Sequence, residues 1–349
     1  MKKIISRFAV ITVLSVQSIY AADNPVSFGG FVDTYYAFDA NQPGNFDRAY
    51  TTQPARHNEF NVNLAHVDAQ LKEDRVHGRI ALQVGTSVQS NYSTEPSWGT
   101  ISGPSLGRHI QEGYVGYRIA EGLWVDAGIY FSHIGAESWI SRDNMTYTRS
   151  LVADYSPYYQ SGAKVTYQLS KPISLQLHVV NGWQTISESN LPKSLGSQVA
   201  YSFSDTTSLT YNTLFGKELG GYRHFHDFIF KMGFTQNWSM GLQADIGFQR
   251  GAGSWNGQSL ISRYALMPTL AFVGRIERYS DPSQIIVTTL SKSGFQVFGA
   301  SLGTDVQLHT RVMWRTEVRA QEAKDAIYPK RDVFSGRDLM VVTSLSLTI

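Results

Sequence analysis

Residues 306–319, VQLHTRVMWRTEVR, alternate between two kinds of side chain. The even positions are apolar or threonine, and the odd positions are mostly polar. All four charges lie at odd positions: Arg311, Arg315, Glu317 and Arg319. Because successive side chains of a β-strand point to opposite faces, this segment would have one apolar and one charged face. The pattern predicts a strand that separates apolar surroundings from a polar interior.

The same alternation recurs along the chain in segments of about ten residues, and helical periodicity is nearly absent. The further segments are 26–40, 58–71, 76–84, 108–119, 123–131, 159–169, 173–183, 197–203, 207–216, 225–234, 238–249, 258–266, 270–279, 293–302 and 337–349. Together with 306–319 they make about sixteen strands, an even number typical of single-chain outer-membrane barrels. We therefore predict an all-β fold, a transmembrane antiparallel β-barrel that occupies residues 22–349.

The connections between these segments alternate in length. Short turns are predicted at 72–74, 120–122, 170–172, 204–206, 235–237, 267–269 and 303–304. Long stretches rich in Gly, Ser, Asn and Pro fall between them, near 41–57, 90–107, 136–158, 184–196, 217–224, 250–257, 280–292 and 320–336. Short periplasmic turns opposite long extracellular loops are the asymmetry of a membrane barrel.

The composition agrees with a wall between lipid and water. Of 349 residues, 17% are charged and 42% are hydrophobic, and soluble domains carry about 25% charged residues. A lipid-facing band must be apolar, so polar side chains would be confined to the interior and the loops. The chain has no cysteine, which excludes a disulfide-stapled scaffold and thiolate metal sites.

Aromatic side chains near the predicted strand ends are expected to form belts at the two membrane interfaces, because they lie on the outward face. The set comprises Tyr36, Phe38, Tyr117, Phe131, Tyr167, Trp183, Tyr211, Phe215, Trp238 and Phe248.

Residues 1–21 have the order of a secretory signal peptide. Lys2, Lys3 and Arg7 precede an apolar run over 8–20, and small residues follow it. Removal of this leader takes three positive charges from the formal charge of +2 and leaves −1. A chain near neutrality argues against a nucleic-acid partner. We expect export to the cell outer membrane, with outer-membrane lipid as a partner.

Four segments carry a resemblance to a known family. They are NEFNVNLA at 58–65, DYSPYYQSG at 154–162, VNGWQ at 180–184 and GRIERY at 274–279. In this order they resemble the OmpL-like family of β-barrel porins of Gram-negative bacteria, over nearly the whole mature chain. The resemblance implies a water-filled channel for passive diffusion of small hydrophilic solutes, and it carries over no particular ligand. By analogy with general porins, a homotrimer is expected.

Inward-facing charges are the candidates for the pore lining. The set comprises Arg275, Glu277, Arg311, Arg315, Glu317, Arg319, His309, Arg79 and Asp126. A row of arginines with intervening carboxylates would create a transverse field that biases which ions pass. The same residues could instead form an ion-pair ladder that stiffens the wall, and the two interpretations are compatible. Both signs are present, so strong ion selectivity is not predicted.

The longest loop, near 136–158, is the candidate constriction. Its charged candidates are Arg142, Asp143, Arg149 and Asp154. As the third long loop, it would either fold inward and narrow the channel, by analogy with general porins, or remain an ordinary exposed loop.

Catalysis has little support in the sequence. Common hydrolase, zinc-protease and nucleotide-binding motifs are absent, and no cofactor or metal is expected. His224 and His226 are interpreted as loop histidines. Two alternatives to a porin remain. An outer-membrane β-barrel enzyme, such as a lipid hydrolase, would need an outward Ser–His pair, which we could not identify. A soluble exported β-sandwich would bind carbohydrate through its Trp and Tyr residues.

Overall fold

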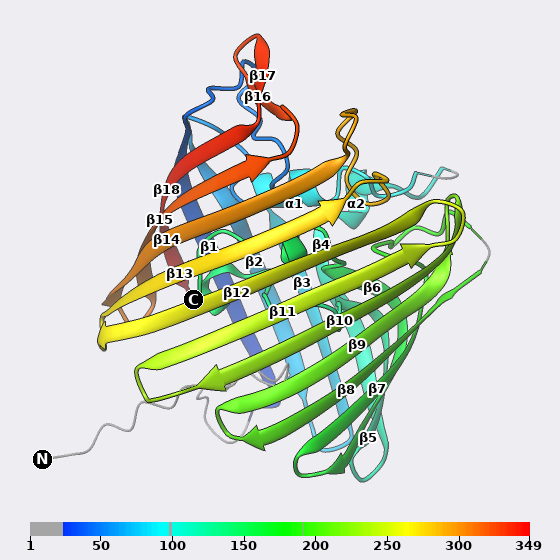
Figure 1. Cartoon of the computed structure of the whole chain (residues 1–349). Coiled ribbons are helices and arrows are strands. Elements are labelled where there is room, and N and C mark those ends of the chain that lie inside the picture. Colours follow the sequence, from blue (N-terminus) through cyan, green and yellow to red (C-terminus); the bar gives the residue numbers. More distant parts are fainter. Residues whose placement is uncertain (1–23, 98–99, 191) are drawn as a thin grey trace, which may run out of the picture.

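The computed structural model describes residues 24–97, 100–190 and 192–349, and sixteen strands within them form one closed barrel (Figure 1). The barrel strands are β1 Val26–Asp39, β2 Phe60–Lys72, β3 Val76–Val84, β4 Ile110–Ala120, β5 Leu123–Phe131, β6 Tyr159–Ser170, β7 Ile173–Val180, β8 Ser194–Ser204, β9 Thr207–Glu218, β10 Gly221–Gly233, β11 Trp238–Gln249, β12 Gly253–Met267, β13 Leu270–Asp281, β14 Phe295–His309, β15 Val312–Ala323 and β18 Arg337–Thr348. The predicted signal peptide, residues 1–21, lies outside the described residues.

The first and last strands close the barrel. Strand β1 pairs antiparallel with β18, from Phe31 opposite Thr348 to Asp39 opposite Met340. Every other barrel strand pairs antiparallel with its neighbours in the closed order. Sixteen strands are therefore confirmed, and the β-sandwich alternative is wrong, because a sandwich consists of two separate sheets.

Short elements occupy the long loops. They are α1 Thr86–Asn91, α2 Pro104–Gly107, a 3-10 turn Ser141–Asp143, α3 Leu151–Asp154, and the small hairpin β16 Tyr328–Lys330 with β17 Val333–Ser335. In Figure 1 the hairpin projects beyond the barrel on the side of the long loops. Within the described residues, no helix combines the length and the apolar character needed to cross a membrane.

The strand predicted over 306–319 is two strands. The chain turns at 310–311 between β14 and β15, and the turn predicted at 303–304 is wrong, since β14 runs through it. Asp305 pairs with Arg315, so odd residues face odd residues across the hairpin. Paired residues share a face, so odd residues point inward in both strands. The alternation of apolar and polar residues therefore continues unbroken through the turn, and the sequence gives no sign of it.

Two predicted long loops are also shorter than expected. Strands β9 and β10 extend into 217–224, and only residues 219–220 join them. Strand β11 ends at Gln249 as predicted, but β12 begins at Gly253 and leaves only residues 250–252 as the turn. Gly220 and Gly251 have φ values of 91° and 82°, which glycine adopts without steric cost. The glycines therefore mark tight turns at the ends of long strands.

The two faces of the wall differ as predicted. Outward apolar side chains such as Val115 and Leu302 are exposed, at 67% and 73%, while inward side chains are mostly buried. Phe215 and Phe248 are exposed on the outer face near the long-loop end. Trp183 does not belong to the aromatic belt. Its ring packs 4.9 Å from the inward ring of Phe225, because β7 ends at Val180 and the loop turns inward.

Candidate functional site

The loop between β5 and β6, residues 132–158, enters the barrel, and we call it the inward loop. Its first residues bind the far wall: the backbone N–H of Gly135 donates to Asp227 on β10 at 2.7 Å. The next N–H, of Ala136, donates to Gln243 on β11 at 2.9 Å. The interpretation of this segment as an ordinary exposed loop is therefore wrong.

The inward loop keeps its shape through local contacts. Ser150 caps α3, and its side chain accepts a hydrogen bond from Ala153 N at 3.3 Å. The Glu137 carboxylate accepts from the backbone N–H of Ser150 at 3.1 Å and also from the Ser150 hydroxyl. The Ser150 cap and the hydrogen bonds from Ser150 to Glu137 thus satisfy backbone N–H groups that the short helix leaves unpaired.

Arg315 on β15 anchors the middle of this loop. Its guanidinium donates to the backbone oxygens of Ser141 at 2.6 Å and Met145 at 2.7 Å. The Nε of Arg315 also pairs with Asp305 at 2.7 Å, and its side chain is 1% exposed. Fixed donors on a planar fork suit several carbonyl acceptors at once, so this arginine holds the loop backbone against the wall.

The remaining members of the inward row form one buried ion-pair network. Arg275 lies 3.2 Å from Glu317, and Arg319 lies 2.7 Å from Glu277. These side chains are at most 2% exposed. The network also binds the inward loop: Thr148 N donates to Glu317 at 2.8 Å, and Leu151 N donates to Glu277 at 2.7 Å. Each buried charge thus has an opposite charge and a hydrogen-bond partner, as burial requires.

Two predicted pore-lining residues lie elsewhere. His309 ends β14 and Arg311 lies in the following turn, and both are exposed. Their assignment to the pore lining is wrong, because the turn at 310–311 places them at the short-turn end of the barrel. The inward loop reaches this turn, since Arg142 donates to Thr310 O at 2.7 Å and also to the Thr348 hydroxyl.

The other charged candidates of the inward loop differ in burial. Asp143 is exposed, whereas Asp154 is buried and accepts a hydrogen bond from the Thr52 hydroxyl at 2.5 Å. Burial raises the pKa of Asp154 above its ordinary value. Arg149 is fully buried, and its guanidinium lies 4.3 Å from the Trp139 ring and 3.7 Å from the Tyr158 ring. This contact is a cation–π sandwich within the loop.

A second charged group lies on strands β2–β6 and keeps access to water. Arg79 on β3 pairs with Asp68 on β2 at 3.2 Å and also with Glu112 on β4. Lys164 on β6 lies 3.9 Å from Asp126 on β5. The Arg79 and Lys164 side chains are 18% and 20% exposed, roughly ten times more than the anchors of the inward loop.

Sequence reasoning missed some interior residues that matter. Lys164 follows the same alternation as Gln160 in its strand, so its inward position was available from the pattern. Asp33 on β1 accepts from the Ser141 hydroxyl at 2.9 Å, and Asp305 holds Arg315. Their inward positions also follow the alternation, but the sequence carries no signal that the inward loop contacts them.

Two histidines meet where the inward loop begins. The His133 and His178 rings stack with centroids 4.0 Å apart. His133 Nδ1 faces Gln160 Oε1 at 3.1 Å, and Nε2 faces Thr213 O at 2.9 Å. Burial lowers the pKa of His133 to about 4. The ring is therefore neutral at pH 7 and packs as a buried polar group. His224 and His226, in contrast, lie on β10 and not in a loop.

Apolar side chains fill the interior near the long loops. Inward residues of strands from β5 to β15 pack with residues of the inward loop and of the loops at 282–294 and 324–336. The buried cluster comprises Tyr130, Ile134, Leu151, Val152, Val180, Leu214, Phe225, Trp255, Tyr279, Val287, Phe295, Val297, Ala323, Ile327 and Tyr328. Within the described residues, no group of three or more His, Cys, Asp or Glu residues could hold a metal ion.

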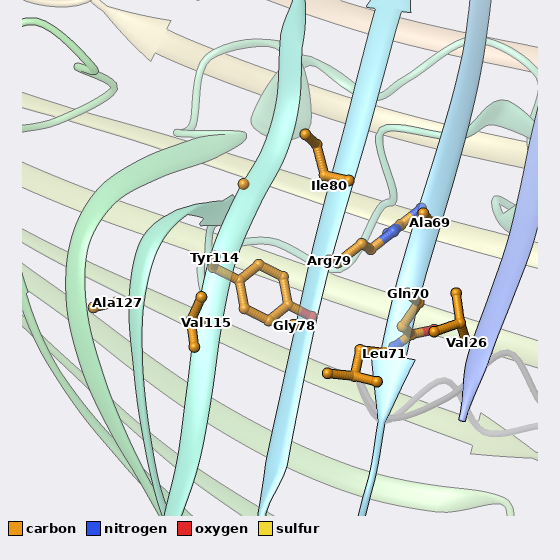
Figure 2. Close-up of a pocket in the computed structure, with 11 residues that line it drawn as sticks. Val26, Ala69, Gln70, Leu71, Gly78, Arg79, Ile80, Tyr114, Val115 and Ala127 are labelled. Carbon is orange, nitrogen blue, oxygen red and sulfur yellow. The ribbon is translucent and has the colours of Figure 1, made fainter. Parts of the chain in front are cut away.

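The outer wall has a shallow apolar groove (Figure 2). Small residues on four neighbouring strands form much of its floor: Ala69, Gly78, Gly113 and Ala127. Leu71, Ile80 and Val115 lie around them. These outward residues alternate with the inward Arg79 and Tyr114, so the groove lies on the lipid side of the wall.

A closed sixteen-strand barrel with an apolar outside, a polar interior and an inward loop defines an outer-membrane channel of the porin class. Residues 25–348 match the family described as beta-barrel porin-2, OmpL-like. The chain belongs to this family, and the predicted resemblance is confirmed.

Solved structures show the same fold at low sequence identity. The chain is similar to the outer membrane channel DcaP of Acinetobacter baumannii, with 11% identity, a TM-score of 0.62, and 93% of this chain and 97% of that chain covered. It is also similar to OprB of Pseudomonas putida, with 10% identity, a TM-score of 0.64, and 93% of this chain and 94% of that chain covered. A third similar structure is an anion-selective porin from Comamonas acidovorans, with 11% identity, a TM-score of 0.57, and 93% of this chain and 99% of that chain covered. A search of curated proteins gives no match.

Proposed function

We propose that small hydrophilic solutes diffuse passively through this porin beside the inward loop, along the interior face of β2–β6. The difference in exposure between the two charged groups supports this path. Arg79 and Lys164 remain accessible to water, whereas Arg275 and Arg319 are sealed beneath the loop. Solutes cross without a covalent step, so we propose no enzymatic role.

The inward loop is the constriction in this proposal, and the inward arginine row sets its position. Asp143 is the charged candidate of that loop with the greatest access to water. Along β2–β6, Arg79 and Lys164 stand next to Asp68, Glu112 and Asp126. Since both signs border the path, the fields partly cancel, and the channel would discriminate weakly between anions and cations.

Planar bilayer recording tests the channel. Purified folded protein is expected to insert in discrete steps, each with a current proportional to voltage, because a water-filled pore conducts ions passively. Protein from the same preparation, unfolded by heat before addition, is the control. If folded protein gives no steps above this control, the proposed diffusion path is wrong.

We propose that residues 1–21 direct export and are removed, and that three copies of residues 22–349 assemble. The groove of Figure 2 supports an assembly contact, because its small side chains would let a second barrel wall approach closely. N-terminal sequencing of protein from outer membranes tests the cleavage. Light scattering in detergent tests the assembly, and the mass of one chain would contradict it.

A further inference from the structure

The outer rim of β9–β13 carries cations that no other described residue neutralises. Lys217, Arg250 and Arg278 are exposed. Within the described part of the chain, the charged groups of these three side chains form no ion pair or hydrogen bond. All three lie near the long-loop end: one residue before the end of β9, one residue after β11, and three residues before the end of β13.

Strand pairing brings two of these cations together. Lys217 on β9 lies directly opposite Tyr222 on β10. The backbone N–H of Arg250 donates to Tyr222 O at 2.9 Å, so Arg250 continues the same row on the other side of Tyr222. Residues paired across antiparallel strands share a face. Lys217, Tyr222 and Arg250 therefore form one outward row. Arg278 lies deeper on β13, in the pairing row of Gln258, Ala244 and Phe228, and is not part of it.

An aromatic row lies directly below, toward the middle of the membrane. His224 is paired with Phe215 on one side and with Phe248 on the other. The centroid of the His224 ring lies 5.5 Å from that of Phe215 and 6.5 Å from that of Phe248. Phe215 and Phe248 are 36% and 49% exposed. Aromatic belts of outer-membrane barrels lie at the lipid–water interface, so the cationic row above this belt lies at the level of the lipid headgroups.

Carboxylates are missing from this outer surface. The outward residues at the long-loop ends of β9–β13 are Thr213, Phe215, Lys217, Tyr222, His224, His226, Ile246, Phe248, Ser254, Asn256, Gln258, Arg278 and Ser280.

The neighbouring acids already have partners. Glu218 accepts from Trp183 N at 3.0 Å, and Asp281 is buried and accepts from Ile286 N at 2.7 Å. In the adjoining loop, Glu188 pairs with Lys193. The positive charge of the rim therefore has no internal counter-charge.

The opposite side of the rim is built differently. Exposed Arg337, at the start of β18, pairs with Glu322 on β15 at 3.0 Å. Arg56, in the loop before β2, pairs with Asp47 at 2.5 Å and with Glu59 at 3.1 Å. These two rim arginines therefore have carboxylate partners, whereas Lys217 and Arg250 have none among the described residues.

We propose that Lys217, Tyr222, His224 and Arg250 form a binding surface for the phosphate groups of anionic lipids in the outer leaflet. The arginine fork and the lysine ammonium are the side chains that bind phosphate oxygens most strongly. The aromatic row below contacts acyl chains. A free phosphate ion would gain nothing from this second row, and the surface faces lipid, so a lipid headgroup is the occupant.

Lipid retention in detergent tests this surface. Folded protein in an uncharged detergent is mixed with lipid A that carries two phosphates, and bound lipid is counted by native mass spectrometry. The double variant Lys217→Gln/Arg250→Gln is expected to bind about tenfold more weakly or worse, since each cation near a headgroup adds to the attraction. Arg337→Gln, which removes an exposed rim cation on the paired side, is expected to bind like the unaltered protein.

Three results would overturn the proposal. They are equal binding by the double variant, equal binding of lipid A without phosphates, and displacement of lipid A by inorganic phosphate at similar molar concentration. Both substituted residues are exposed, and a gel of unheated samples checks that each variant is folded. Bilayer conductance should be unchanged in the double variant, so this test is independent of the proposed diffusion path.

Discussion

At the residue scale, some interior charged side chains are buried under the inward loop and others stay accessible to water, and the alternation of the sequence alone does not distinguish the two groups. Arg79 and Arg315 both occupy inward positions of a strand, and the sequence predicts that orientation for each. The difference arises because the inward loop covers Arg315 and leaves Arg79 accessible. Loop placement depends on contacts between residues far apart in the chain, such as Ser141 with Arg315. No local sequence pattern records them.

Arg315→Gln should destabilise the protein by about 3 kcal/mol, because it leaves Asp305 and several loop carbonyls without their buried donor. The free energy of unfolding in urea, measured in detergent, checks this value. Arg311→Gln is the matched control, since Arg311 is exposed in the turn, and its effect should stay within about 0.5 kcal/mol. Equal losses in the two variants would contradict the anchoring role.

His133 should make stability depend on pH between about 4 and 6.5. Burial lowers its pKa from 6.5 to about 4, so in this window the unfolded chain binds a proton that the folded chain does not. Stability then falls as pH falls through the window, by about 3 kcal/mol from this group when the change is complete. Unfolding free energies of the unaltered protein and His133→Asn, compared at several pH values, isolate this contribution. Parallel pH profiles would argue against it.

At the element scale, the strand number and most of the short turns could be predicted, but the turn between β14 and β15 could not. The alternation in 306–319 is real, but it spans β14, a turn and β15, because odd residues pair with odd residues across the hairpin. The glycines of 250–257 indicated a long loop, yet Gly251 and Gly253 allow a tight turn instead. The inward loop was one of two open alternatives, since composition does not distinguish a loop buried in protein from one in water.

Gly196→Ala should loosen the start of the inward loop. A Cβ at Gly196 would lie 2.6 Å from Cε1 of the rigid His133 ring and 3.2 Å from His178 Cβ. Relief of this clash requires the loop to shift, at a cost of about 1–3 kcal/mol. Limited proteolysis should then cut residues 132–158 faster.

Gly274→Ala is the control for this loop prediction. Its Cβ would meet Leu302 Cδ2 at an ordinary 3.4 Å, so digestion should match that of the unaltered protein. Resistance of Gly196→Ala to the protease would show that the His133 contact does not position the loop.

At the scale of the whole molecule, the fold follows from the need to satisfy every strand edge in hydrocarbon, which only closure achieves. The pairing of β1 with β18 meets that need. The charge missing from the composition is explained by the apolar outer wall, and much of the remaining charge lies inside. One side of the interior fixes the inward loop, and β2–β6 presents accessible polar groups, which is why we place solute passage there.

Cysteine accessibility in a planar bilayer tests that path most directly, because the natural chain has no cysteine. Thr166→Cys places a thiol on the inward face of β6, and Ser301→Cys places one on β14, where the inward residue is buried. A positively charged methanethiosulfonate reagent should reduce the current through Thr166→Cys channels and leave Ser301→Cys channels unchanged. Block of Ser301→Cys without block of Thr166→Cys would contradict passage along β2–β6.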